Sequence, residues 1–260
     1  MTPKMIFFDI DGTIMDEWGY IPPSAVDAIR GARRKGNLCL VNTGRPYTHI
    51  EPFVVDIGFD GYVCSCGSHV ILDGKSLFRA TVPPRVCDQI VARAGACRLD
   101  AYYEAEEGMR YTLLHAPSRG MKIYLDRMAE RGFDLSGSPE GFRFDKFCVW
   151  AHSDSDFAAF AAYAETYFAL IGRGGGMYEC VLRGYDKAGG IRAVAEARGI
   201  PLADCYAIGD STNDLPMLSC VPHSIAMAAA PESVRSRVEY VTGELKADGL
   251  AGALAHYGLC

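Results

Sequence analysis

The stretch Met5-Ile-Phe-Phe-Asp9-Ile-Asp11-Gly12-Thr13 decides the fold and locates the chemistry. Its apolar run leads directly into acidic residues, which is typical of a buried parallel strand that ends at a functional edge of a sheet. Side chains at positions i and i+2 share one side of an extended chain, so we expect Asp9 and Asp11 to face one site. Gly12 permits the tight turn that leaves both acids exposed.

Two carboxylates at one site would repel each other and any anionic substrate. The pair therefore indicates a hard divalent cation, Mg²⁺. One carboxylate can then act as a nucleophile and the other as an acid and base. A calcium-binding loop also begins with Asp-x-Asp, but it needs a further Asp or Asn before the glycine and a Glu at its far end. Neither is present here, and an ordinary turn is the remaining alternative.

Three later segments combine with this stretch into an ordered set of motifs. They are Asn42-Thr43-Gly44-Arg45 after the apolar run 38–41, Lys187 within residues 184–189, and Gly209-Asp210-Ser-Thr-Asn213-Asp214 after the run 205–208. In their order and spacing the four motifs resemble those of the haloacid dehalogenase-like (HAD) phosphohydrolases, in particular the Cof-type sugar-phosphate phosphatases with a late-inserted (C2-type) cap. The resemblance spans nearly the whole chain.

The resemblance implies a role for each motif residue. Asp9 is expected to attack phosphorus and form an aspartyl-phosphate, and Asp11 to protonate the leaving alcohol and then activate water. Mg²⁺ is expected to be held by Asp9, the backbone carbonyl of Asp11 and Asp210, while Asp214 holds the water shell of the metal or orients Lys187. The expected substrate-binding residues are Thr43, Gly44, Arg45, Lys187 and Asn213.

Each of these assignments has a plain structural alternative. Thr43 would serve equally as a turn hydroxyl, and Lys187 alone would be a solvated surface lysine. Asp210 or Asn213 could cap a helix without binding any metal. Arg45 alone would be a surface salt-bridge partner. These alternatives stay open as long as only the sequence is considered.

Composition narrows the class of protein. The chain has 260 residues, 49% of them hydrophobic, and a formal net charge of −6, which argues against a general nucleic-acid binder. The N-terminus enters the first predicted strand without a signal core, and the Ala-rich stretch 157–171 is too short to span a bilayer. We therefore expect a cytoplasmic enzyme without a membrane partner, and its oligomeric state stays open.

Ten scattered cysteines predict reduced thiols, and the six histidines show no metal-ligand spacing.

Residues 1–82 and 185–260 alternate between strand and helix patterns, which predicts a Rossmann-like parallel sheet with helices on both faces. At the start of one helix, Ser24 and Asp27 resemble a capping box. The expected strands are 5–10, 38–42, 62–64, 205–208, 224–227 and 240–242, and the expected helices are 24–35, 187–198, 215–219 and 231–238.

Residues 83–184 carry none of the four motifs and are too long for an unstructured loop, so we expect them to fold as an inserted α/β cap domain. The Gly-rich stretch 172–176 is more typical of a hairpin turn than of a phosphate site. The expected cap helices are 84–94, 118–131 and 154–167, and the expected strands are 101–104, 111–114, 144–151, 168–171 and 177–182.

Taken together, these features predict a Mg²⁺-dependent phosphomonoester hydrolase that acts on a small phosphorylated metabolite, a sugar phosphate. One alternative is a phosphomutase of the same superfamily, against which the segment Thr43-Gly44-Arg45 argues by resemblance. Another alternative is a catalytically silent protein that binds a phosphorylated metabolite. A pure binder, however, does not need a nucleophile and an acid and base together.

Overall fold

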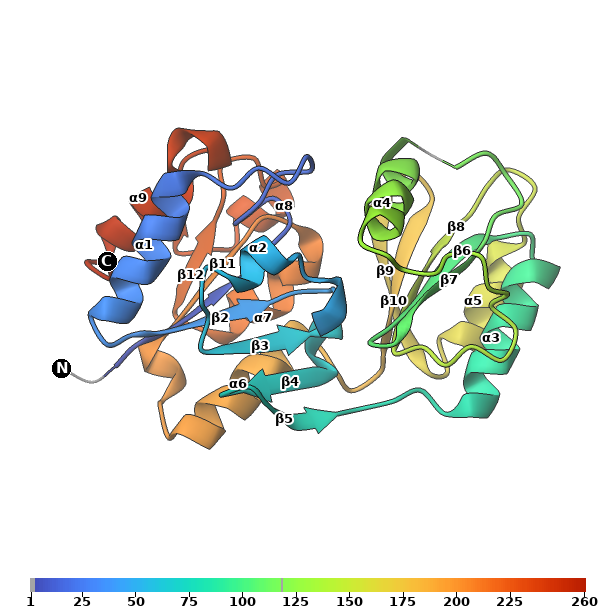
Figure 1. Ribbon diagram of the computed structural model, residues 1–260, viewed down its shortest axis with the longest axis horizontal. Helices are drawn as coiled ribbons and strands as arrows, with labels where there is room; N and C mark the ends of the chain where they lie inside the picture. The colour runs from blue at the N-terminus through green and yellow to red at the C-terminus, as the bar shows by residue number, and fades with distance from the viewer. Residues whose placement is uncertain (1–2, 118) are drawn as a thin grey trace. The chain divides into compact units, whose positions relative to one another are not determined.

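The computed structural model describes residues 3–117 and 119–260, and the chain divides into two compact units (Figure 1). Unit 1 comprises Met1–Arg45, Ile50–Arg79 and Tyr185–Cys260, and unit 2 comprises Pro46–His49 and Ala80–Gly184. The sequence does not predict that residues 46–49 group with the inserted segment. Within the described residues, no helix is both long enough and apolar enough to cross a membrane.

Unit 1 is built on an eight-stranded sheet in the order β13-β12-β11-β1-β2-β3-β4-β5. The strands from β13 to β3 are parallel, as predicted, and β4 and β5 add an antiparallel edge. The bounds are β1 Met5–Phe8, β2 Leu38–Asn42, β3 Gly61–Cys64, β4 His69–Leu72, β5 Lys75–Arg79, β11 Cys205–Gly209, β12 His223–Ala226 and β13 Tyr240–Val241. Neither β4 nor β5 is among the expected strands. Strand β5 is largely exposed and lacks an apolar run, whereas the apolar run of β4, residues 70–72, is only three residues long.

Helices cover both faces of this sheet (Figure 1). On one face, α6 (Lys187–Arg198) and α7 (Leu215–Cys220) pack against Met5 and Phe7 of β1. The alternate residues of β1 point to the other face, where α1 (Pro23–Arg34) and α9 (Gly249–His256) lie side by side. All four residues of β1 are therefore buried, which explains its continuous apolar run. Two short helices, α2 (Pro52–Val55) and α8 (Glu232–Arg235), complete the unit.

The predicted capping box at the start of α1 is wrong. The helix begins at Pro23, and no side chain caps its first turn. Proline is favoured at the first helical position because its missing N–H would have no partner there. The hydroxyl of Ser24 instead donates to Asp248.

Unit 2 contains a five-stranded antiparallel sheet in the order β7-β6-β8-β10-β9. The helices α3 (Pro84–Ala96) and α5 (Phe157–Ala164) pack on one face, and α4 (Arg119–Glu130) lies on the other (Figure 1). Ser118, the expected first residue of that helix, lies outside the described residues. The strands are β6 Asp100–Ala105, β7 Gly108–Thr112, β8 Lys146–Trp150, β9 Phe168–Gly174 and β10 Met177–Leu182, and β9 and β10 form the predicted hairpin.

The parallel strands β2, β1 and β11 are neighbours that end where polar residues begin. Phe8 is in register with Val41 on one side and with Ile208 on the other. Because the carboxyl ends of parallel strands share one edge, the chain segments that follow β1, β2 and β11 meet there. The fold of unit 1 therefore brings three of the four sequence motifs to one place.

Candidate active site

Lys187 is fully buried between two carboxylates of unit 1. Its Nζ donates to Oδ1 of Asp9 and to Oδ1 of Asp214, each at 2.6 Å. Burial alone would lower the pKa of Lys187, but Asp214 and Asp9 outweigh that effect and raise the pKa. The side chain therefore stays charged, and the alternative of a solvated surface lysine is wrong.

Helix α6 and strand β2 hold Lys187 in place. The Asp186 side chain caps the helix by accepting from the backbone N–H of Gly189 at 2.6 Å. Gly199 ends the helix in the left-handed region, directly after the predicted last residue 198. The side-chain amide of Asn42, which is fully buried, donates to the carbonyl oxygen of Lys187 at 2.9 Å. Sequence reasoning gave Asn42 no role, although a polar residue at the end of an apolar strand is a usable signal.

Asp214 connects Lys187 to the loop after β11. Its Oδ2 accepts from the backbone N–H of Asp210 at 3.0 Å and of Ser211 at 2.9 Å. Ser211 and Asp214 form a reciprocal capping box at the single 3₁₀ turn Thr212–Asp214 that precedes α7, so this turn is capped by Ser211 rather than by Asp210 or Asn213. A side chain at Gly209 would place its Cβ 2.6 Å from Cγ of Asp214, which excludes larger residues from that position.

Asp9, Asp210 and Asp214 form a compact group of carboxylates. One oxygen of each lies within 4.8 Å of the others. Burial, followed by the charge of Asp214, raises the pKa of Asp9 well above its usual range, and Lys187 opposes this only in part. Lys187 contacts two of these three carboxylates, and the candidate ligand atoms of the group are all oxygens. The group therefore fits a hard divalent cation such as Mg²⁺.

The loop after β1 lies directly against Asp210. Gly12 has a φ of +85°, and a Cβ there would lie 2.3 Å from Oδ2 of Asp210. The hydroxyl of Thr13, which is fully buried, lies 3.4 Å from Oδ1 of Asp210. Only glycine suits both the backbone conformation and the space at position 12, so the turn predicted from the sequence also positions the carboxylate of Asp210.

Asp11 is not a member of this group and pairs with Arg45. Its two oxygens accept from Nη2 of Arg45 at 2.6 Å and from Nε at 2.9 Å. Asp9 is 5% exposed, whereas the side chain of Asp11 is 53% exposed. The expectation that both acids are exposed on one side is therefore wrong for Asp9. The alternation rule does not reach Asp11, because β1 ends at Phe8 and the chain turns.

Arg45 is itself a buried residue with a second partner. Its Nη1 donates to Oε2 of Glu51 at 2.6 Å, and only 9% of Arg45 is exposed. Burial would lower the pKa of Arg45, but Asp11 and Glu51 raise it. Arg45 is therefore not a surface salt-bridge partner. The sequence gives no local signal for Glu51, because it belongs to none of the motifs.

Thr43 and Gly44 follow the end of β2, and Asn213 lies in the 3₁₀ turn after β11 at the same sheet edge. The hydroxyl oxygen of Thr43 accepts from the backbone N–H of Arg45 at 3.2 Å, which is the turn role considered for it. A hydroxyl that accepts one bond keeps its proton to donate, so a second role toward a phosphate is compatible. Asn213 accepts at its Oδ1 from the hydroxyl of Ser211 at 2.7 Å.

Comparison with known proteins identifies the family of this chain. The sequence profile of haloacid dehalogenase-like hydrolases matches residues 6–254. The chain belongs to this family. YkrA of Bacillus subtilis (strain 168), which is provisionally named as a phosphatase, is 27% identical over 261 residues, covering 100% of this chain and 99% of YkrA. The pyridoxal phosphate phosphatase YbhA of Escherichia coli (strain K12) is 22% identical over 96% of this chain and 97% of YbhA.

A solved structure shows the same fold. The sugar phosphatase BT4131, of HAD subclass IIB, aligns with a TM-score of 0.84 at 21% sequence identity, covering 99% of this chain and 100% of BT4131. The α/β fold and the HAD family predicted from the four motifs are thus confirmed.

Proposed function

We propose that this HAD phosphatase hydrolyses a small phosphomonoester, a sugar phosphate, in a Mg²⁺-dependent reaction with an aspartyl-phosphate intermediate at Asp9. The observation that carries the proposal is the buried contact of Lys187 with Asp9 and Asp214 beside Asp210. This arrangement supplies a nucleophile (Asp9), a positively charged ammonium group (Lys187) and a group of oxygen ligands for a metal ion at one sheet edge.

Asp9 is the proposed nucleophile. Lys187 binds its Oδ1, which leaves Oδ2 as the oxygen that attacks phosphorus. A carboxylate must be ionised to act in this way, and burial disfavours that state. Lys187 favours the ionised form of Asp9 and can offset the negative charge of the transferring phosphoryl group.

Asp11 is the proposed acid and base. It would protonate the leaving alcohol oxygen and then take a proton from the water that attacks the aspartyl-phosphate. Arg45 binds both of its oxygens and so fixes the orientation of the carboxyl group. Because Glu51 binds another nitrogen of Arg45, the guanidinium stays in place when it releases one oxygen of Asp11.

The remaining motif residues would bind the metal and the phosphate. Asp9, Asp210 and the backbone carbonyl of Asp11 would hold Mg²⁺, which supplies charge neutralisation for the carboxylates and the phosphoryl group. The hydrogen bonds of Asp214 favour its role in orienting Lys187 over a role in the water shell of the metal. The phosphoryl oxygens would be bound by Thr43, Gly44, Arg45, Lys187 and Asn213.

The names of YbhA and BT4131 support a small phosphorylated substrate, because they specify pyridoxal phosphate and a sugar phosphate. The test is a screen of the purified chain against phosphorylated sugars, nucleotides and cofactors, with Mg²⁺ and with EDTA. We expect phosphate release with Mg²⁺ only, and no release by the Asp9→Asn variant, which controls for contaminating phosphatases. Isomer formation without phosphate release would indicate a phosphomutase, and saturable binding without turnover would indicate a silent binder.

A further inference from the structure

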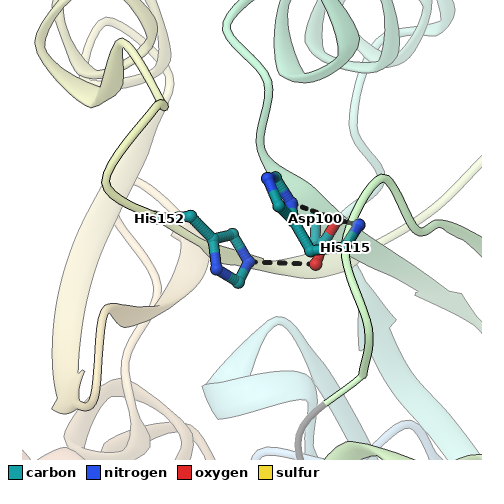
Figure 2. A group of neighbouring side chains, drawn as sticks. All are labelled: Asp100, His115 and His152. Carbon is teal, nitrogen blue, oxygen red and sulfur yellow. Dashed lines mark hydrogen bonds and ion pairs between the residues drawn. The ribbon is translucent and has the colours of Figure 1, made fainter.

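A second group of metal-ligating side chains lies within unit 2 (Figure 2). Asp100 is the first residue of β6, His115 follows β7 and His152 follows β8. Strand β6 pairs antiparallel with both neighbours, with Asp100 opposite Trp150 and Ala101 opposite Thr112. The start of β6 therefore meets the ends of β7 and β8, and the sheet itself brings the three side chains together.

Asp100 contacts both imidazoles, through one carboxylate oxygen each. Its Oδ1 is 3.2 Å from Nδ1 of His115, and its Oδ2 is 3.0 Å from Nε2 of His152. Candidate ligand atoms of the three residues all lie within 4.8 Å of one another. Oδ1 of Asp100 also accepts from the backbone N–H of Leu114 at 2.6 Å. The carboxylate is therefore held in place before any ligand binds.

We propose that Asp100, His115 and His152 form a Zn²⁺ site. Two imidazoles and one carboxylate that leave a fourth position open are a common ligand set for Zn²⁺. Mg²⁺ prefers ligand sets made of oxygen atoms, as in the group around Asp9. The two groups should therefore select different metals, and this proposal does not depend on the proposed phosphatase mechanism.

The surroundings of His115 match those of a metal-bound histidine. Its Nε2 lies 3.0 Å from Oδ1 of Asp154, and Nη2 of Arg98 binds Oδ2 of Asp154 at 2.6 Å. Histidines that bind a metal through one nitrogen commonly donate the other N–H to a carboxylate in this way. A neutral imidazole has one N–H, so it cannot donate to Asp100 and Asp154 at once. If the N–H at Nε2 donates to Asp154, a cation at Nδ1, either a metal ion or a proton, has to provide the interaction with Asp100.

Zn²⁺ binding requires a small rearrangement. The rings of His115 and His152 are stacked, with centroids 3.9 Å apart and planes 26° apart, so their lone pairs do not converge on one point. At least one ring must turn about its side-chain torsions. The side chains of His115 and His152 are 22% and 32% exposed, which leaves space for that rotation.

The proposal is tested by titrating the tag-free chain of 260 residues with Zn²⁺ by calorimetry and by measuring retained zinc after dialysis. The titration is repeated in an Asp9→Asn, Asp210→Asn background, so that zinc in the carboxylate group of unit 1 does not contribute. We expect one Zn²⁺ per chain in this background. His115→Gln or His152→Gln should weaken binding by more than about a hundredfold, and Asp154→Asn by about ten- to a hundredfold.

His223→Gln is the matched control, because His223 also faces a carboxylate, that of Glu239 at 3.2 Å, but lies in unit 1. Its zinc binding should equal that of the parent protein. Long-range ¹H–¹⁵N spectra of the wild-type chain need no variant, and Zn²⁺ should shift Nδ1 of His115 and Nε2 of His152. Unchanged histidine spectra, or equal zinc affinity in the parent and in His115→Gln and His152→Gln, would overturn the proposal and leave a proton as the cation at His115.

Discussion

Replacing Lys187 by methionine removes the ammonium group that binds both Asp9 and Asp214, while it keeps a flexible chain of similar size. The side chains of Asp9 and Asp214 are 7% and 0% exposed, so water cannot replace the lost partner. Removing one member of a buried ion pair costs about 3–5 kcal/mol of unfolding free energy. We expect a loss of at least this size for Lys187→Met near neutral pH without metal.

The loss should depend on pH. The pKa of Asp9 is already raised by burial and by Asp214, and it rises further when Lys187 is removed. A carboxyl group with a raised folded pKa stabilises the fold below its unfolded pKa, and this contribution is lost as the pH rises through the folded pKa. The cost of Lys187→Met should therefore be smallest near about pH 4, the unfolded pKa of Asp, and grow at higher pH.

Urea unfolding followed by circular dichroism in EDTA measures this cost, and a second titration with Mg²⁺ should restore part of it. Lys146→Met is the matched control, because Lys146 is buried in unit 2 and lies 2.6 Å from Glu179. It should also lose stability, but Mg²⁺ should not restore it. A loss below about 1 kcal/mol for Lys187→Met, the value for an exposed pair, would refute the reasoning. Equal recovery of both variants with Mg²⁺ would refute the metal site.

Three further experiments test individual residues. Asp11→Asn should slow both chemical steps and let the phosphoenzyme persist, and an unchanged single-turnover rate in rapid-quench experiments would exclude its acid and base role. Asp210→Ala should raise the Mg²⁺ concentration needed for half-maximal activity more than Asp214→Ala does, whereas a wild-type titration curve for Asp210→Ala would contradict the ligand assignment. Gly209→Ala should cost about 1–3 kcal/mol in urea unfolding, because its Cβ overlaps Asp214; unaltered stability would show that the loop adjusts freely.

Local patterns in the sequence predicted the parts of the fold that depend on local physics. The apolar run before Asp9 predicts a buried parallel strand, and the helical pattern over residues 187–198 predicts the bounds of α6. Strands β4 and β5 were both missed: β5 because an exposed edge strand needs no apolar run, and β4 because its apolar run is only three residues long. The burial of Asp9 was also missed. Strand alternation predicts only the side of the strand on which a side chain lies, whereas the burial of Asp9 depends on residues far along the chain, such as Lys187.

The contacts that complete the two candidate sites could not be predicted from spacing. Glu51 meets Arg45 across a loop, with no pattern that marks it in advance. Asp100, His115 and His152 come from three separate strand ends, so their distances along the chain carry no metal-binding signature. Only the antiparallel pairing of β6 with β7 and β8 brings them together.

Phosphoryl transfer to Asp9 is the step on which the proposed mechanism depends, and trapping the intermediate tests it most directly. The Asp11→Asn variant is mixed with p-nitrophenyl phosphate and Mg²⁺, quenched in acid and reduced with borohydride, which converts an aspartyl-phosphate into homoserine. Peptide mass spectrometry should find homoserine at position 9, and none in the Asp9→Asn, Asp11→Asn double variant. A phosphoryl group on another residue, or wild-type turnover by Asp9→Asn, would contradict the assignment of Asp9 as the nucleophile.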